Sequence, residues 1–181
     1  MGDARDLRVQ DLSGAAVQAY RHPHPVSAVA ISPDGERVAF ADVSPAVWMW
    51  EASSNRPREL SRLSGVRNCL AFAPDGGTIA VAAAAQVKLL DSVRGQLLAV
   101  LSGHEKVVLA LRFSPDGRLL ATAAFDKTVR IWELPSGRER SCLRNHRGGV
   151  GAVAFSPDGK TLASEDGYGD VILWNPAGAK N

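Results

Sequence analysis

The chain has 181 residues, of which 45% are hydrophobic and 22% charged, a composition typical of a globular domain with an adequate core. Its 21 Lys and Arg against 19 Asp and Glu leave a net charge of only +2, which argues against a surface built mainly to bind polyanions. Cys69 and Cys142 suggest neither a disulfide framework nor a zinc site, and no run of about 18 apolar residues occurs. We expect a soluble, cytoplasmic chain with two reduced thiols.

A four-residue turn recurs four times along the chain. Residues 32–35, 73–76, 114–117 and 156–159 each read Ser or Ala followed by Pro-Asp-Gly, a sequence that suits a type I β-turn. The prolines are 41, 41 and 42 residues apart, and the flanking runs are short, apolar and β-branched. A period of about 40 to 45 residues with four short strands in each unit is typical of β-propeller blades.

The N-terminal stretch predicts a partial blade over residues 7–20, with strands at 7–12 and 15–20. Blade one follows over about 21–62, with strands near 26–31, 37–41, 46–50 and 57–62. Phe40 and Ser44 stand where the third repeat has Thr122 and Asp126, so we expect the polar chemistry of this blade to be eroded.

Blade two is predicted over about 63–101. Its alanine run at 82–85 is too short for a helix and fits a strand and loop instead. Blade three, about 102–143, is the most regular repeat. Blade four, about 144–175, has Tyr168 at the position of Asp126, which leaves Asp166 or Asp170 as substitutes. It stops at the turn that would lead into its outer strand.

The third repeat resembles the repeat of the WD40 family. It has Gly103-His104 near its start, the Ser-Pro-Asp-Gly turn, and a strand that ends in Trp132-Glu133, where glutamate replaces the family's aspartate. The resemblance implies an all-β, WD40-type propeller of about four blades of four antiparallel strands, in a single domain over 1–181. Seventeen strands are expected, whereas a closed ring of four blades needs sixteen and one of seven needs twenty-eight. We therefore expect an incomplete, open ring or part of a larger propeller.

The resemblance also implies a buried hydrogen-bond relay. In blade three the relay would join His104, Thr122, Asp126 and Trp132. In blade four its members would be His146, Ser164 and Trp174.

The same side chains could be interpreted as a hydrolytic triad, but no Gly-x-Ser-x-Gly motif accompanies them. His22-Pro23-His24 is weak evidence for a metal site, because no cysteine or carboxylate lies near it. The inner strands near 26–31, 66–72, 107–113 and 150–155 carry no carboxylate or histidine that a metal enzyme would need. We predict no catalytic residue, no metal and no cofactor.

Two basic stripes raise the alternative of nucleic-acid binding. One contains Arg138, Arg140, Arg144, His146 and Arg147, and the other contains Arg56, Arg58, Arg62 and Arg67. Both run along expected outer strands, where charge prevents edge-to-edge aggregation, and neither carries interleaved aromatic residues for base stacking.

By analogy with the family, the partner face would be formed by the loops after the second and fourth strands of each blade. The candidate residues are His24, Arg67, Glu105, Lys106, Phe125, Arg147 and Tyr168. Phe125 would be the anchor. We expect a non-catalytic scaffold for protein partners of unknown identity, with a second copy or upstream blades completing the ring. A hydrolytic or metal-dependent propeller enzyme is the alternative, ahead of a nucleic-acid platform.

Overall fold

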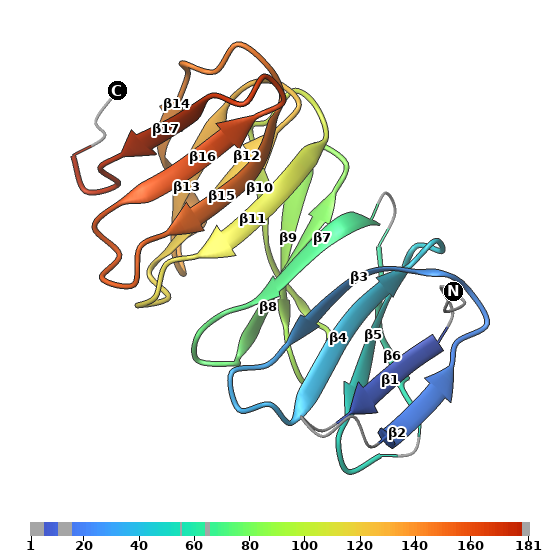
Figure 1. Cartoon of the computed structure of the whole chain (residues 1–181). Helices are drawn as coiled ribbons and strands as arrows, with labels where there is room; N and C mark the ends of the chain where they lie inside the picture. Colours follow the sequence, from blue (N-terminus) through green and yellow to red (C-terminus); the bar gives the residue numbers. More distant parts are fainter. Residues whose placement is uncertain (1–5, 11–15, 55, 64–65, 179–181) are drawn as a thin grey trace.

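The computed structural model describes residues 6–10, 16–54, 56–63 and 66–178. Seventeen strands form five antiparallel sheets, and no helix occurs in these residues (Figure 1). In every sheet of three or four strands, neighbours in the sequence are neighbours in the sheet. The all-β prediction of about four blades that do not close into a ring is confirmed.

The strands follow the predicted repeats. The N-terminal sheet contains β1 (Asp6–Gln10) and β2 (Ala16–Arg21). Blade one contains β3 (Val26–Ile31), β4 (Arg37–Asp42), β5 (Ala46–Glu51) and β6 (Arg58–Arg62). Blade two contains β7 (Val66–Phe72), β8 (Thr78–Ala83), β9 (Gln86–Asp91) and β10 (Leu97–Ser102). Blade three contains β11 (Val108–Phe113), β12 (Leu119–Ala124), β13 (Val129–Glu133) and β14 (Arg138–Leu143). Blade four contains β15 (Val150–Phe155), β16 (Leu162–Asp166) and β17 (Val171–Trp174).

The alanine run that could have been a helix forms the end of β8 and the turn after it, as expected. Parts of the two predicted N-terminal strands, residues 11–12 and 15, lie outside the described residues.

The Pro-Asp-Gly turns join the first and second strands of each blade. In blade three the Ser114 hydroxyl donates to Asp116 at 2.6 Å and accepts from the N–H of Leu119 at 2.9 Å. Gly117 has a φ of 71°, a left-handed conformation that glycine adopts at little cost. The turn proline also lies against the turn glycine of the next blade, so the turns stack along one end of the molecule.

The core consists of three apolar clusters, one at each junction between consecutive blades. At the first junction, Ala39 and Ala41 of β4 belong to the same cluster as Leu70 and Phe72 of β7. Small side chains of one blade therefore admit large side chains of the next, and this pairing recurs at the other junctions. Burying each large side chain contributes roughly 1.5–3 kcal/mol.

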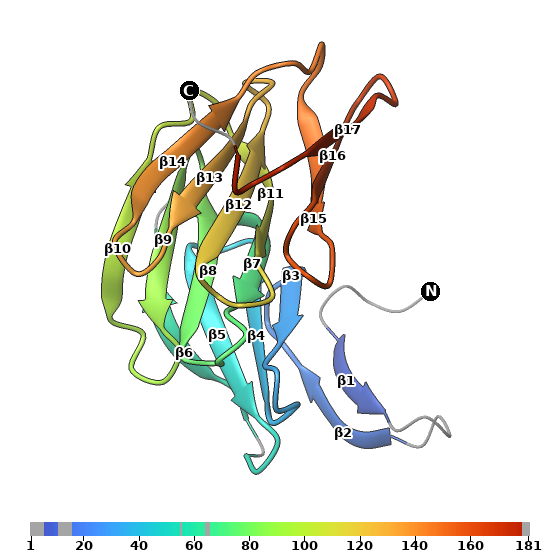
Figure 2. The same ribbon diagram turned by 90° about the vertical axis from the view of Figure 1, so that its left-hand side faces the viewer.

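The blades form an arc with two separated ends. The β1–β2 hairpin lies beside blade one, and β17 lies at the other end of the arc (Figures 1 and 2). Both ends are far apart in the two views, so this chain does not close its own ring.

Candidate functional site

Four side chains of blade three form a continuous hydrogen-bonded chain. The Trp132 indole N–H donates to the Thr122 hydroxyl oxygen at 2.9 Å, and that oxygen lies 2.8 Å from His104 Nε2. His104 Nδ1 lies 2.9 Å from an oxygen of Asp126. Every group in this chain has a partner when His104 is neutral: the Thr122 hydroxyl donates to Nε2, and the Nδ1–H donates to Asp126.

The electrostatics of this group match that assignment. Burial lowers the pKa of His104 below its usual value, although Asp126 opposes the shift. Burial would raise the pKa of Asp126, but hydrogen bonds from Thr128, the Glu105 N–H and His104 outweigh it and lower the pKa to about 2.

A hydrolytic role for this group requires a hydroxyl that a substrate can reach. Thr122 is fully buried and His104 is 7% exposed. The Thr122 hydroxyl is also held between the indole and the imidazole. The four hydrogen-bonded side chains therefore link β12, β13 and the loop before β11, as a structural relay does.

Blade four has a similar group built around Ser164. The Trp174 indole donates to its hydroxyl oxygen at 2.7 Å, and His146 Nε2 lies 2.6 Å from the same oxygen. Asp166, not Asp170, faces the imidazole, with 3.3 Å between an Asp166 oxygen and His146 Nδ1. Asp170 pairs with Arg147 instead.

Blade one holds a polar group that the repeat positions do not predict. Phe40 and Ser44 stand where blade three has Thr122 and Asp126, which predicts that the relay is eroded. In the structure His22 Nε2 lies 2.8 Å from Asp42, and the Trp48 indole donates to the same carboxylate oxygen at 3.1 Å. Phe40 supplies no hydroxyl, in line with the prediction, but the carboxylate link is present because Asp42 lies two residues before Ser44.

His22 is therefore committed to Asp42 in the interior and is only 1% exposed, whereas His24 is exposed. The neighbouring histidines thus face different surroundings. Within the described part of the chain, no group of three or more His, Cys, Asp or Glu side chains could hold a metal ion. The described residues also include no helix that is long and apolar enough to cross a membrane.

A groove between blades three and four collects part of the predicted partner face. Its volume is about 530 Å³, and four of the seven candidate residues line it: Lys106, Phe125, Arg147 and Tyr168. Phe125 lies in the loop between β12 and β13, and Tyr168 in the equivalent loop of blade four. Their side chains are 58% and 75% exposed.

The three other candidates do not line this groove. His24 lies on blade one, far along the arc, and its side chain is exposed. Glu105 is exposed beside the groove, where its backbone N–H donates to Asp126. Arg67 lies within β7, and its side chain is outside the described residues.

Two glycines that the sequence analysis did not single out shape the groove. A Cβ atom on Gly148 would lie 2.7 Å from the Tyr168 ring, and one on Gly149 would lie 2.8 Å from the Phe125 ring. Both rings therefore lie directly on the backbone before β15, where no larger residue fits without displacing them.

Positive charge predominates around these rings. Lys106 lies over the Phe125 ring, with its Nζ 5.7 Å from the ring centroid, and Lys127 also lines the groove. Glu165 contributes one exposed carboxylate. The Asp166 carboxylate is buried, where it accepts from the N–H groups of Arg147 and Gly148.

Several arginines of the two basic stripes are paired with acidic side chains. Arg62 pairs with Glu59, and Arg138 pairs with Glu133. Arg58 contacts Glu51 and donates to the carbonyl of Val93 in the next blade. These pairs reduce the positive field that a nucleic acid would need.

Comparisons with known proteins agree with this architecture. Residues 95–133 and 137–175 match the family model for the WD domain, G-beta repeat. The chain is also similar to meiotic recombination protein rec14 of Schizosaccharomyces pombe, with 34% identity over 119 residues. That alignment covers 65% of this chain and 39% of the relative. The two matched segments are therefore WD40 repeats, and the series of antiparallel sheets has the strand order of β-propeller blades.

Proposed function

We propose that this chain is a non-catalytic scaffold that binds a protein partner in the groove between blades three and four. The observation that carries the proposal is the pair of exposed rings, Phe125 and Tyr168, that line this groove. Large exposed aromatic side chains on a rigid backbone are typical anchors of protein interfaces, because they bury much apolar area with little loss of side-chain freedom.

The charges around the rings support a partner segment of particular chemistry. Lys106 and Lys127 bring positive charge to a groove in which Glu165 is the exposed carboxylate. We infer that the segment carries acidic side chains next to an apolar one, so that the carboxylates meet the lysines and the apolar group packs between the rings.

We also propose that the chain catalyses no reaction. Two observations support this: the Thr122 hydroxyl is buried, and the predicted inner strands carry no carboxylate or histidine. The cytoplasmic location stays a prediction. The role in the relative's name, meiotic recombination, is not extended to this chain, because the similarity covers only 39% of that protein.

The proposal is tested with two short fluorescein-labelled peptides, one containing glutamates around a tryptophan and one with lysines in place of the glutamates. Fluorescence anisotropy should show binding of the acidic peptide only. Phe125→Ala and Tyr168→Ala should each weaken that binding, because each removes one wall of the groove. The same variants then serve as baits in pull-downs analysed by mass spectrometry.

Two further variants separate binding from damage to the fold. Gly149→Ala should weaken binding by displacing the Phe125 ring, while Val43→Ala removes an exposed apolar side chain on blade one and should have no effect. Thermal melts verify that each variant is folded. Equal binding of the acidic peptide by all variants would overturn the proposal, and so would a preference for the basic peptide.

A further inference from the structure

The three junctions between blades place the same two repeat positions together at the end where the turns stack. The residue four positions after each turn proline is Arg37 in blade one, Thr78 in blade two and Leu119 in blade three. Each lies at the same junction as the aromatic residue that ends the inner strand of the next blade. These aromatic residues are Phe72, Phe113 and Phe155.

Two of the junctions carry a long side chain at this position. Arg37 lies over the Phe72 ring, with its guanidinium carbon 5.6 Å from the centroid. It also donates to the carbonyl of Gly76 at 3.0 Å and to the Ser92 hydroxyl at 2.9 Å. At the third junction, Leu119 packs in the same apolar cluster as Phe155.

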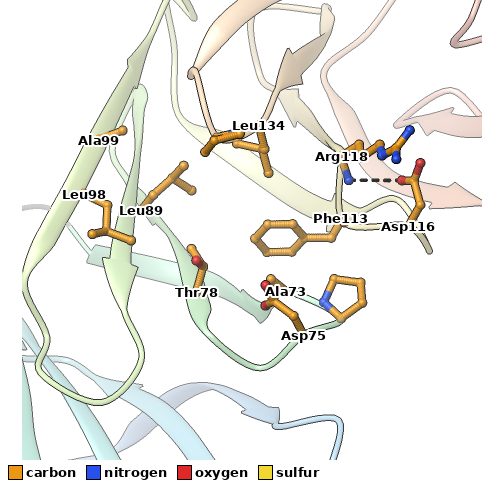
Figure 3. Close-up of a pocket in the computed structure, with 13 residues that line it drawn as sticks. Ala73, Asp75, Thr78, Leu89, Leu98, Ala99, Phe113, Asp116, Arg118 and Leu134 are labelled. Atoms are coloured by element: carbon orange, nitrogen blue, oxygen red, sulfur yellow. Dashed lines mark hydrogen bonds between the residues drawn. The ribbon is translucent and has the colours of Figure 1, made fainter.

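The middle junction is hollow because Thr78 is shorter than either counterpart. A cavity of about 350 Å³ opens between blades two and three. Figure 3 shows the Phe113 ring pointing into it, with Leu134 above the ring and Leu89 and Leu98 across from it. Leu98 is 53% exposed, so the cavity reaches the surface beside an uncovered apolar side chain.

The lining indicates which side chain would fit. Ser92 and Leu134 occupy equivalent positions, since their N–H groups donate to Gly77 and Arg118, which are themselves equivalent. A guanidinium at the middle junction would therefore lose the hydroxyl acceptor that Arg37 uses, and it would meet a leucine instead. The middle junction thus favours an apolar occupant, as the third junction does with Leu119.

Charged residues at the mouth of the cavity add a second preference, for a basic group. Asp75 and Asp116 line it together with Arg118, so carboxylates outnumber cations. Asp116 accepts from the Ser114 hydroxyl and the Arg118 N–H, which hold its carboxylate in the turn. A basic group next to the inserted side chain would meet these carboxylates.

We propose that this cavity is a second docking site, which takes one large apolar side chain of a partner protein flanked by a basic residue. It is formed by the turns, whereas the groove beside Phe125 is formed by the loops at the other ends of the strands. The two sites are therefore independent, and the chain can hold two partner segments at the same time.

Blocked amino acids are suitable probes of this site. Titration with N-acetyl-leucine amide should shift the NMR signals of the Leu98 and Leu134 methyl groups and the Phe113 ring, and N-acetyl-arginine amide should shift them less. A blocked Lys-Leu dipeptide should bind more tightly than Glu-Leu. That difference should vanish in the double variant Asp75→Asn, Asp116→Asn, because the charged rim is then removed.

Thr78→Leu copies the third junction and should abolish these shifts while raising the melting temperature, because it fills the cavity. Thr161→Leu is the matched control, since Thr161 has the equivalent position in blade four and lies outside the cavity. Shifts that survive Thr78→Leu would overturn the proposal. Equal or tighter binding of the arginine probe would also overturn it, as would no binding by any probe.

Discussion

Asp126 ties three segments of blade three together. Its carboxylate accepts from the Glu105 N–H in the loop before β11 and from the Thr128 hydroxyl in the loop before β13, and it faces His104. Replacing Asp126 by alanine removes this partner from the buried Thr128 hydroxyl and the buried His104 imidazole. We expect Asp126→Ala to lower the free energy of unfolding by about 1 to 3 kcal/mol, and Thr122→Val to have an effect of the same size.

Urea denaturation of the variants measures this effect. Glu105→Ala is the control, because its exposed side chain is replaced while its N–H still donates to Asp126. An Asp126→Ala protein with an unchanged denaturation midpoint would show that the relay contributes nothing to stability.

The shifted pKa values of this group predict how stability depends on pH. Because burial lowers the pKa of His104, the unfolded chain takes up this proton at a higher pH than the folded chain. The His104 contribution is therefore present above pH 6.5, the ordinary value, and is lost as the pH falls below it. The Asp126 contribution is lost at lower pH, between its ordinary value of 3.8 and about 2.

We expect the free energy of unfolding to fall between pH 7 and pH 5, with a share from His104 of at most about 1.4 kcal/mol per pH unit. His104→Gln should be less stable than the wild type at pH 7 but should show a shallower dependence on pH. Urea denaturation at a series of pH values gives both slopes. Identical slopes in the two proteins would contradict a lowered pKa at His104.

At the scale of the strand, the aspartate that faces the buried histidine does not occupy one fixed position in the repeat. Asp126 lies two residues beyond the end of β12, whereas Asp42 and Asp166 are the last residues of β4 and β16. A fixed offset from the turn proline therefore points to Ser44 and Tyr168, whereas the side chains that face the histidines are Asp42 and Asp166. In both repeats the useful signal was an aspartate two residues after the hydroxyl position.

The sequence did predict the strands, because the turn residues and the repeat period depend only on local chemistry. The groove and the cavity depend on packing between blades. Nothing local to Gly148 or Gly149 indicates that aromatic rings from other loops lie on them. The hollow at Thr78 could have been inferred by comparing it with Arg37 and Leu119, but only after the junction contact was known.

At the scale of the whole molecule, the two ends of the arc expose the two halves of a blade junction. Val129 and Ile131 of β13 are fully buried under blade four. Their equivalents on β17, Val171 and Leu173, are 64% and 67% exposed. Blade four thus exposes the apolar face that, in blade three, is covered by the following blade.

Blade one exposes the complementary half of the junction. Leu70 and Phe72 of β7 are buried against blade one. Their equivalents on β3, Val29 and Ile31, are 59% and 64% exposed, and the N-terminal sheet beside them has two strands, β1 and β2, among the described residues. Contact between blade four of one copy and blade one of a second copy would rebuild a junction that occurs three times within the chain.

We therefore expect the chain to associate head to tail with a second copy. Light scattering should give at least twice the chain mass, and Leu173→Glu should return the protein to a monomer because it places a charge in the rebuilt junction. Val93→Glu is the control, since Val93 is similarly exposed but lies in a loop of blade two away from either end. A wild-type monomer at high concentration would contradict association. If hydrogen exchange then protected the amides of 150–174 as well as those of 107–132, the monomer would be covering the face of blade four by closing its own ring.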